Sequence, residues 1–198
     1  TCRVLLVTDS GFRIGGLALT PGFRLENVRQ DVRELVNVAK TAAGTHLGKR
    51  DDRRTVPLFG LAAAWDLVAG AQLYANASQS FRPMVFTQAV PNGATNVVNA
   101  DLAEGRAVQF EFGHRARPFP GLVLDASAFQ LEFDDQIGTL ALPGGRSTVA
   151  NVGRAVHRGV ELSGTYNLLR TVAGSRGAAL SLHANALLLD AEFKQGAV

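Results

Sequence analysis

Residues 71–80 alternate between two kinds of side chain without interruption. Ala71, Leu73, Ala75 and Ala77 are small or apolar, and every residue between them is polar or amphipathic. Successive side chains of a strand point to opposite faces of its sheet, so a period of two marks a strand whose faces meet different surroundings. This segment therefore predicts a sheet with one apolar face and one polar face.

The composition fits such a sheet better than it fits other classes of protein. Hydrophobic residues make up 46% of the 198 residues, yet no run of about 18 apolar residues occurs, which excludes a transmembrane helix. Charged residues make up 19%, fewer than the roughly 25% of ordinary soluble domains. The net charge is only +3 and no basic run stands out, so we expect no nucleic-acid partner. The single cysteine, Cys2, allows no internal disulfide.

The alternation recurs in eight segments, and the gaps between them are alternately short and long. We predict long gaps at residues 28–54, at 82–103 and around 143–145, and a helical turn within residues 28–40. Membrane barrels join their strands by short turns on one side and longer loops on the other. The predicted fold class is therefore all-β: an antiparallel meander of about eight strands that forms part of a transmembrane β-barrel, as an open wall. The predicted strands span residues 3–8, 14–27, 55–66, 71–81, 104–115, 122–135, 149–168 and 178–193.

Several segments resemble the barrel of TonB-dependent outer-membrane receptors. Glu104, followed by Glu111, Gly113 and Arg115, is similar to the family's glutamate and its later glutamate-x-glycine-x-arginine pattern. The loop sequence VFTQAVPNG, residues 85–93, is most similar to ferric-dicitrate receptors. The resembling segments, in the order of the family, are residues 17–28, 73–83, 102–115, 124–138 and 151–168.

The resemblance implies a plugged barrel of about 22 strands, of which residues 1–198 would be one segment. The plug domain and the last strands would lie outside this chain. The implied function is active uptake of an iron chelate, either ferric citrate or another siderophore, across the outer membrane of a Gram-negative bacterium. The implied partners are the chelate, the TonB complex through the plug, and outer-membrane lipid with lipopolysaccharide. No cofactor is implied.

Candidate ligand-binding residues follow from the charge of the ligand that the resemblance implies. Ferric citrate is anionic, so guanidinium and amide groups suit it. Arg82 and Gln88 lie on or beside the loop with the best match, and we rank them first. The predicted 28–54 loop supplies the remaining candidates, which are Arg29, Arg33, Lys49, Arg50, Arg53 and Arg54.

Four charged residues within predicted strands fall on the polar side of the alternation. They are Arg24, Glu26, Glu111 and Glu161. An arginine at the lipid midplane would cost about 2–4 kcal/mol, so we predict that these side chains face the barrel lumen.

Nothing in the sequence supports an enzyme. The four histidines are dispersed without metal-ligand spacing, and neither a phosphate-binding loop nor a nucleophile elbow occurs. We therefore expect no catalytic residue and no metal site. Two other readings stay open: a complete eight-stranded outer-membrane barrel that acts as a binding or adhesion module, and a soluble lipocalin-like carrier.

Overall fold

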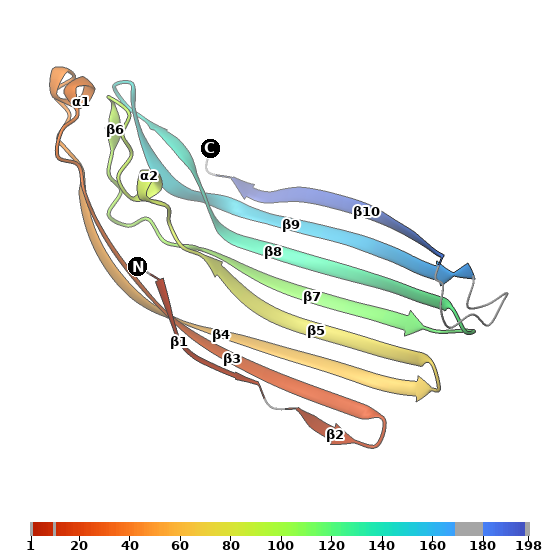
Figure 1. Cartoon of the computed structure of the whole chain (residues 1–198). Helices are drawn as coiled ribbons and strands as arrows, with labels where there is room; N and C mark the ends of the chain where they lie inside the picture. Colours follow the sequence, from red (N-terminus) through yellow and green to blue (C-terminus); the bar gives the residue numbers. More distant parts are fainter. Residues whose placement is uncertain (1, 10, 169–179, 197–198) are drawn as a thin grey trace.

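One antiparallel sheet forms most of the molecule (Figure 1). The computed structural model describes residues 2–9, 11–168 and 180–196. Eight strands lie side by side in the order β1-β3-β4-β5-β7-β8-β9-β10, while the short β2 pairs with β3 and β6 pairs with β9. The strands are β1 (Cys2–Asp9), β2 (Phe12–Ile14), β3 (Leu17–Arg33), β4 (Lys49–Val68), β5 (Ala71–Arg82), β6 (Asn96–Val97), β7 (Gly105–Ala116), β8 (Leu122–Leu142), β9 (Arg146–Asn167) and β10 (Ser181–Gly196).

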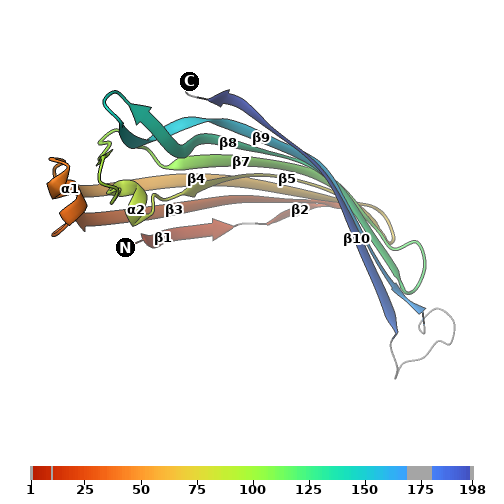
Figure 2. The ribbon, with the colours of Figure 1, turned by 90° about the horizontal axis from the view of Figure 1, so that it is seen from above.

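The sheet is open. β1 and β10 stand at its two ends, and within the described residues no ladder joins them. Figure 2 shows the strands running together as one bent ribbon. The predicted fold class, an antiparallel meander forming part of a barrel wall, is confirmed.

The connections differ between the two ends of the strands. At one end, here called the loop end, residues 34–48 and 83–104 form loops that contain α1 (Val38–Ala42) and α2 (Phe86–Ala89). At the other, the turn end, a two-residue turn joins β4 to β5, with Gly70 at φ 85°. No helix in the described part of the chain has the length and apolarity needed to cross a bilayer.

Two of the predicted long gaps are wrong. β3 continues to Arg33 and β4 already begins at Lys49, and these two residues are register partners. Residues 28–33 and 49–54 are thus paired strand, and only residues 38–42 of the predicted helical region are helical. The segment around residues 143–145 is a tight turn between β8 and β9, with Gly144 and Gly145 at positive φ.

The predicted irregularity of β8 lies a little beyond its expected place. The β8–β9 ladder is regular at Gln130 and shifts register between Phe133 and Gln136. Asp135, within the shift, has φ 57°, as expected where a bulge adds a residue to one strand. The turn predicted at residues 174–177 lies outside the described residues.

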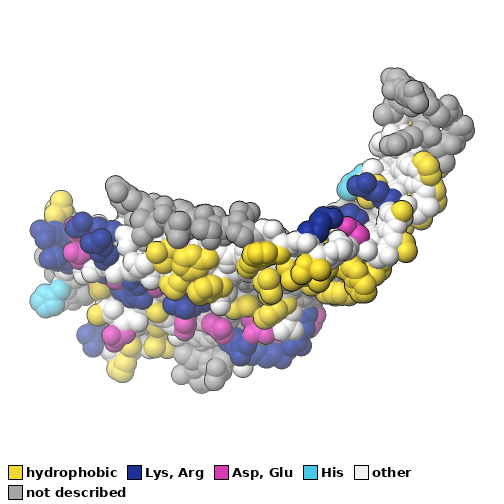
Figure 3. Space-filling model, turned by 90° about the horizontal axis from the view of Figure 1, so that it is seen from below, with side chains coloured by type: hydrophobic (Ala, Val, Ile, Leu, Met, Phe, Trp, Pro, Cys, Tyr) yellow, Lys and Arg dark blue, Asp and Glu magenta, His cyan; other side chains and the backbone are white. Residues whose placement is uncertain are grey.

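One face of the sheet is apolar and uncovered. The register aligns Leu61 on β4 with Ala77 on β5 and Phe110 on β7. Leu61 is 52% exposed, Phe110 48% and Leu188 on β10 73%. Figure 3 shows hydrophobic side chains along the middle of the sheet and Lys and Arg gathered at the end that carries α1. A soluble carrier would pack these side chains onto a shared core, so the lipocalin-like alternative is not supported.

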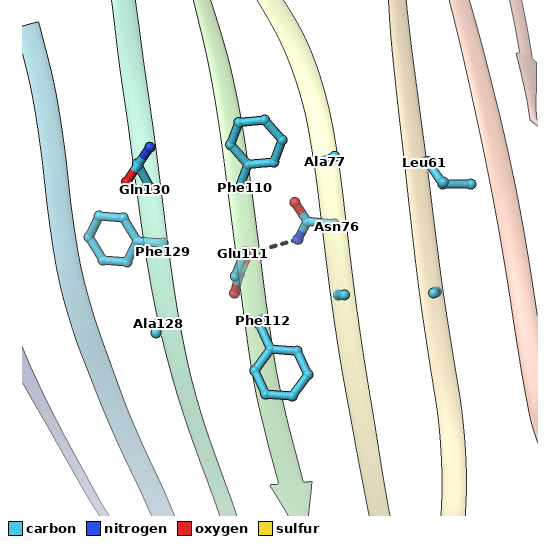
Figure 4. A pocket seen from close by; sticks show the side chains of 11 residues that line it. Leu61, Asn76, Ala77, Phe110, Glu111, Phe112, Ala128, Phe129 and Gln130 are labelled. Carbon is cyan, nitrogen blue, oxygen red and sulfur yellow. Dashed lines mark hydrogen bonds between the residues drawn. The ribbon is translucent and has the colours of Figure 1, made fainter.

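The other face, here called the polar face, carries the residues between those of the apolar rows. Asn76 lies between Ala75 and Ala77 on β5 and donates from Nδ2 to Glu111 Oε2 on β7 at 2.8 Å. In Figure 4 this bond crosses between the two strands, and Phe110 and Phe112 flank Glu111 along β7. The two faces thus follow the alternation predicted from residues 71–80.

Candidate functional site

Loop 83–104 folds back over the polar face at the loop end. Gln30 on β3 donates from Nε2 to the Met84 carbonyl oxygen at 3.2 Å. On the far side, β6 pairs in parallel with the start of β9, and Asn151 on β9 both accepts from the Ala103 amide and donates to its carbonyl oxygen. The loop is therefore fixed at two sides of the sheet and forms an ordered cover over the polar face.

Arg50 on β4 holds the middle of this loop. Its side chain is 7% exposed, and it donates to the carbonyl oxygens of Asn99 at 2.6 Å and Leu102 at 2.8 Å. It also pairs with Asp52 at 3.2 Å. All its contacts are internal, so Arg50 positions the loop and is not presented to a ligand.

Arg54 extends the same network by one more residue along the polar face. Its Nε lies 3.1 Å from Asp52 Oδ2, and its Nη1 lies 2.8 Å from Glu104 Oε2 at the end of the loop. Together with Arg50 the network holds two cations and two anions. Because these charges cancel, the network attracts an anionic ligand less than its arginines suggested from the sequence.

A loop latch, formed by Glu34, Lys40 and Pro91, joins the two loops. The Lys40 side chain is 0% exposed; its Nζ donates to Glu34 Oε2 at 2.8 Å and to the Pro91 carbonyl oxygen at 2.5 Å. Beside it, Asn37 donates to the Asn92 carbonyl oxygen at 2.9 Å. A buried ammonium is tolerated only where such partners replace water, so the latch fixes loop 34–48 against loop 83–104.

The carboxylate of the latch is bound on several sides. Hydrogen bonds from Lys40, from the Gly48 amide and from Asn37 lower the pKa of Glu34 from 4.5 to about 2. Gly48 also permits the close contact of the loops, because a Cβ there would stand 2.3 Å from Val90 Cγ1. The two loops therefore form one packed unit at neutral pH.

The two first-ranked candidates differ in what they are free to contact. Arg82 ends β5 on the polar side of its alternation; it is exposed and has no hydrogen bond or ion pair with any described residue. Gln88 uses its Oε1 to accept from the Val85 amide at 3.1 Å at the start of α2. Arg82 is thus available to a ligand, whereas the Gln88 carbonyl oxygen is already engaged.

The other candidates lie on the opposite side of the sheet from Arg50 and Arg54. Arg29, Arg33, Lys49 and Arg53 are exposed, and they share the face of Phe59 and the apolar rows. They were predicted in one loop with Arg50 and Arg54, but the strand alternation separates the two groups. Only Arg82, Arg50 and Arg54 are brought together with the loop cover.

A second polar network lies nearer the turn end. Tyr74 Oη donates to Asp125 Oδ1 at 2.7 Å, and Arg115 Nε donates to Asp125 Oδ2 at 2.8 Å. The Arg115 guanidinium carbon stands 5.4 Å from the centre of the Tyr74 ring, a cation–π distance. Sequence reasoning singled out Arg115 only within the glutamate-x-glycine-x-arginine pattern, and it missed Tyr74 and Asp125. The spacing of that pattern, every second residue, was the available signal that its members share a face.

The charged strand residues predicted to face the lumen all occupy positions on the polar face. Glu26 is 7% exposed, and its Oε1 pairs with Arg24 Nε at 2.7 Å. Glu111 binds Asn76, while Glu161 is exposed opposite Ser127. In the part of the chain that the structure describes, no three histidine, cysteine, aspartate or glutamate side chains form a group that could hold a metal ion.

One family profile covers nearly the whole chain. The family described as TonB dependent receptor-like, beta-barrel, matches residues 9–196. The chain belongs to the TonB-dependent receptor β-barrel family. As a wall segment of such a barrel, the sheet turns its apolar face to lipid and its polar face to the interior. No curated protein sequence matches the chain.

Solved TonB-dependent receptors share this fold at low sequence identity. The FrpB iron transporter from Neisseria meningitidis is 14% identical with a TM-score of 0.67, covering 95% of this chain and 25% of its own. The ferric yersiniabactin uptake receptor FyuA from Yersinia pestis is 17% identical with a TM-score of 0.66, covering 92% and 26%. The Serratia marcescens hemophore receptor HasR is 19% identical with a TM-score of 0.59, covering 77% and 29%. The chain thus spans about a quarter of the length of these receptors.

Proposed function

We propose that this chain is part of an outer-membrane receptor of a Gram-negative bacterium that takes up an iron chelate with energy supplied through TonB. The observation that carries the proposal is the two-faced wall: an exposed apolar belt on one side and, on the other, a polar face covered by fixed loops. Family membership supports it. The similar structures include an iron transporter, a ferric yersiniabactin uptake receptor and a hemophore receptor. Such uptake breaks no covalent bond, so the receptor is not an enzyme.

For the transported ligand we propose a negatively charged ferric chelate, with ferric citrate first and another siderophore second. The choice of ferric citrate rests on the likeness of residues 85–93 to ferric-dicitrate receptors. Arg82 is the residue best placed to contact it, since its guanidinium is exposed on the polar face at the loop end. Gln88 would contribute through its amide nitrogen, because its carbonyl oxygen caps α2.

The remaining arginines have different proposed roles. Arg50 and Arg54 act indirectly, by fixing loop 83–104 through Leu102 and Glu104. Arg24, Glu26, Glu111 and Glu161 would face the lumen and the plug, through which TonB acts. The face that carries Phe59 would contact outer-membrane lipid and lipopolysaccharide.

Uptake by the full-length receptor tests this function. Cells that produce it as their only ferric-chelate receptor are given ⁵⁵Fe-labelled ferric citrate and, separately, other ferric siderophores, with and without TonB. For Arg82→Gln we expect ligand binding to weaken by about tenfold or more, the effect of losing one charged hydrogen bond. Arg106→Gln is the matched control, since Arg106 is also exposed at the loop end but pairs in register with Phe81 on the other face.

The possible outcomes separate the parts of this proposal. TonB-dependent uptake of a different ferric chelate, and not of ferric citrate, would contradict the ligand and leave the receptor function standing. No TonB-dependent uptake of any ferric chelate would contradict the function itself. Equal binding by Arg82→Gln and wild type would remove Arg82 from the site.

A further inference from the structure

The β3–β4 ladder ends in rungs where residues of like charge face each other. Like charges directly opposite on neighbouring strands destabilise a sheet, so three such rungs in succession call for an explanation. We name them the charged rungs. They pair Arg29 with Arg53, Asp31 with Asp51, and Arg33 with Lys49.

The charged rungs stand directly beyond the apolar belt on the same face. Phe23 and Phe59 are register partners in the belt, with ring centres 5.3 Å apart. Two rungs further lie Asn27 and Thr55, joined by a hydrogen bond of 3.0 Å between Asn27 Nδ2 and Thr55 Oγ1. The first charged rung follows at once. The side chains of the charged rungs therefore emerge where hydrocarbon gives way to lipid headgroups.

The charges in these rungs are not neutralised within the chain. Arg33, Lys49 and Arg53 are exposed and form no ion pair with any described residue, and neither do Asp31 and Asp51. Four cations and two anions leave a local charge of +2. The surplus positive charge on this face is available to an external anion.

Charged residues at the same end of β8–β10 behave differently. Arg154 pairs with Glu132 and, at 3.2 Å, with Asp134, and Lys194 pairs with Glu192. Arg158 Nε donates to the Gln130 side chain at 2.8 Å. Position beyond the belt does not by itself leave a cation unpaired, so the charged rungs are a distinct surface.

We propose that the charged rungs dock a headgroup bearing two phosphates, carried by an outer-leaflet lipid of the membrane in which the barrel stands. Guanidinium groups match phosphate oxygens in paired hydrogen bonds. The two basic rungs are four residues apart along each strand, which corresponds to about 13 Å. That spacing fits two phosphates on one headgroup, one at each basic rung, with the acidic rung between them. The inference rests on the proposed membrane location and not on the identity of the chelate.

Binding of defined lipids to the full-length receptor tests this inference. The purified receptor, stripped of native lipid and held in zwitterionic nanodiscs, is titrated with diphosphoryl lipid A, monophosphoryl lipid A and inorganic phosphate. The test variant replaces Arg29, Arg33, Lys49 and Arg53 by Gln. The matched control replaces Arg106, Arg154, Arg158 and Lys194 by Gln, which removes the same charge from the paired cluster.

We expect the test variant to bind diphosphoryl lipid A at least about tenfold more weakly than wild type, since each basic residue at a membrane surface contributes measurably to anionic lipid binding. The control should stay within about twofold. Monophosphoryl lipid A should bind wild type more weakly than diphosphoryl lipid A, and inorganic phosphate should compete poorly.

Three results would overturn the proposal: equal affinity of wild type and test variant, equal losses in test and control variants, or equal affinity for the two lipids. Heat-dependent gel mobility checks that each variant is folded. If the fourfold variant does not fold, the pairs Arg29→Gln with Arg53→Gln and Arg33→Gln with Lys49→Gln are used, and each should lose affinity. Chelate binding is measured on the same preparations, so that a failed ligand proposal and a failed lipid proposal can be told apart.

Discussion

The ring of Tyr74 on β5 lies over Gly113, its register partner on β7. A Cβ at residue 113 would stand 2.2 Å from Tyr74 Cζ. The absence of a side chain there lets the ring cross β7, so that its hydroxyl reaches Asp125 on β8 at 2.7 Å. Glycine at this position thus links three strands through a single tyrosine.

Gly113→Ala should therefore displace Tyr74 and break its bond to Asp125. We expect a loss of about 1–3 kcal/mol in the free energy of unfolding, the usual cost of forcing an extra methyl group into a packed site. Urea unfolding of the full-length receptor in detergent, followed by near-ultraviolet circular dichroism, measures it. Gly22→Ala is the control, because a Cβ there would have its nearest neighbour at 3.8 Å; equal losses in both variants would refute the role of Gly113.

The loop latch predicts a local effect of removing Lys40. Lys40→Met leaves Glu34 without its ammonium partner and frees the Pro91 carbonyl oxygen. Breaking a buried pair by removing one partner typically costs about 3–5 kcal/mol, so we expect faster amide hydrogen exchange in residues 34–48 and 85–98. Lys194→Met removes an exposed pair with Glu192 and should change little. Unchanged exchange in the Lys40 variant would show that the loops are held by other contacts.

The latch should also respond to acid. Because the pKa of Glu34 is lowered from 4.5 to about 2 in the folded loop, its contribution is complete above pH 4.5 and is lost as the pH falls toward 2. Limited proteolysis of loop 34–48 with an acid-active protease should accelerate across that range in wild type. Glu34→Gln should already be cleaved faster at pH 4.5 and should show a flatter profile. An identical pH profile for both proteins would contradict this assignment.

Two arginines three residues apart on β4 should behave oppositely. Arg50→Gln removes the donor to the Asn99 and Leu102 carbonyl oxygens and should cost about 1–3 kcal/mol in local stability of loop 83–104. Arg53→Gln, on the exposed face, should leave that loop unchanged. Hydrogen exchange in residues 96–104 reports both effects. The prediction fails if both variants loosen the loop, or if neither does.

The sequence predicted the strands well wherever lipid and interior impose different side chains on the two faces. β5 was placed to within one residue because residues 71–80 alternate cleanly. The same reasoning failed at residues 28–33 and 49–54, where both faces carry charge and the period of two disappears while the backbone pairing continues. Beyond the apolar belt, polarity no longer separates strand from loop.

The candidate site was predicted only in its chemistry. Basic residues near the loop end were expected, but their division between two faces depends on strand register, which a supposed loop conceals. Arg50 and Lys40 bind backbone carbonyl oxygens of a distant loop, and a carbonyl group has no residue type to reveal it. The crossing of Tyr74 over Gly113 depends likewise on β5 and β7 being neighbours in the sheet.

The most direct test of the two-faced wall is an accessibility scan along β5. In the full-length receptor in bilayers, with Cys2 replaced by serine, spin labels are placed one at a time at Ala75, Asn76, Ala77 and Ser78. We expect labels at 75 and 77 to collide preferentially with oxygen, which concentrates in lipid, and labels at 76 and 78 with a water-soluble nickel complex. Accessibility without a period of two, or with the two faces exchanged, would contradict the assignment of this chain as a membrane barrel wall.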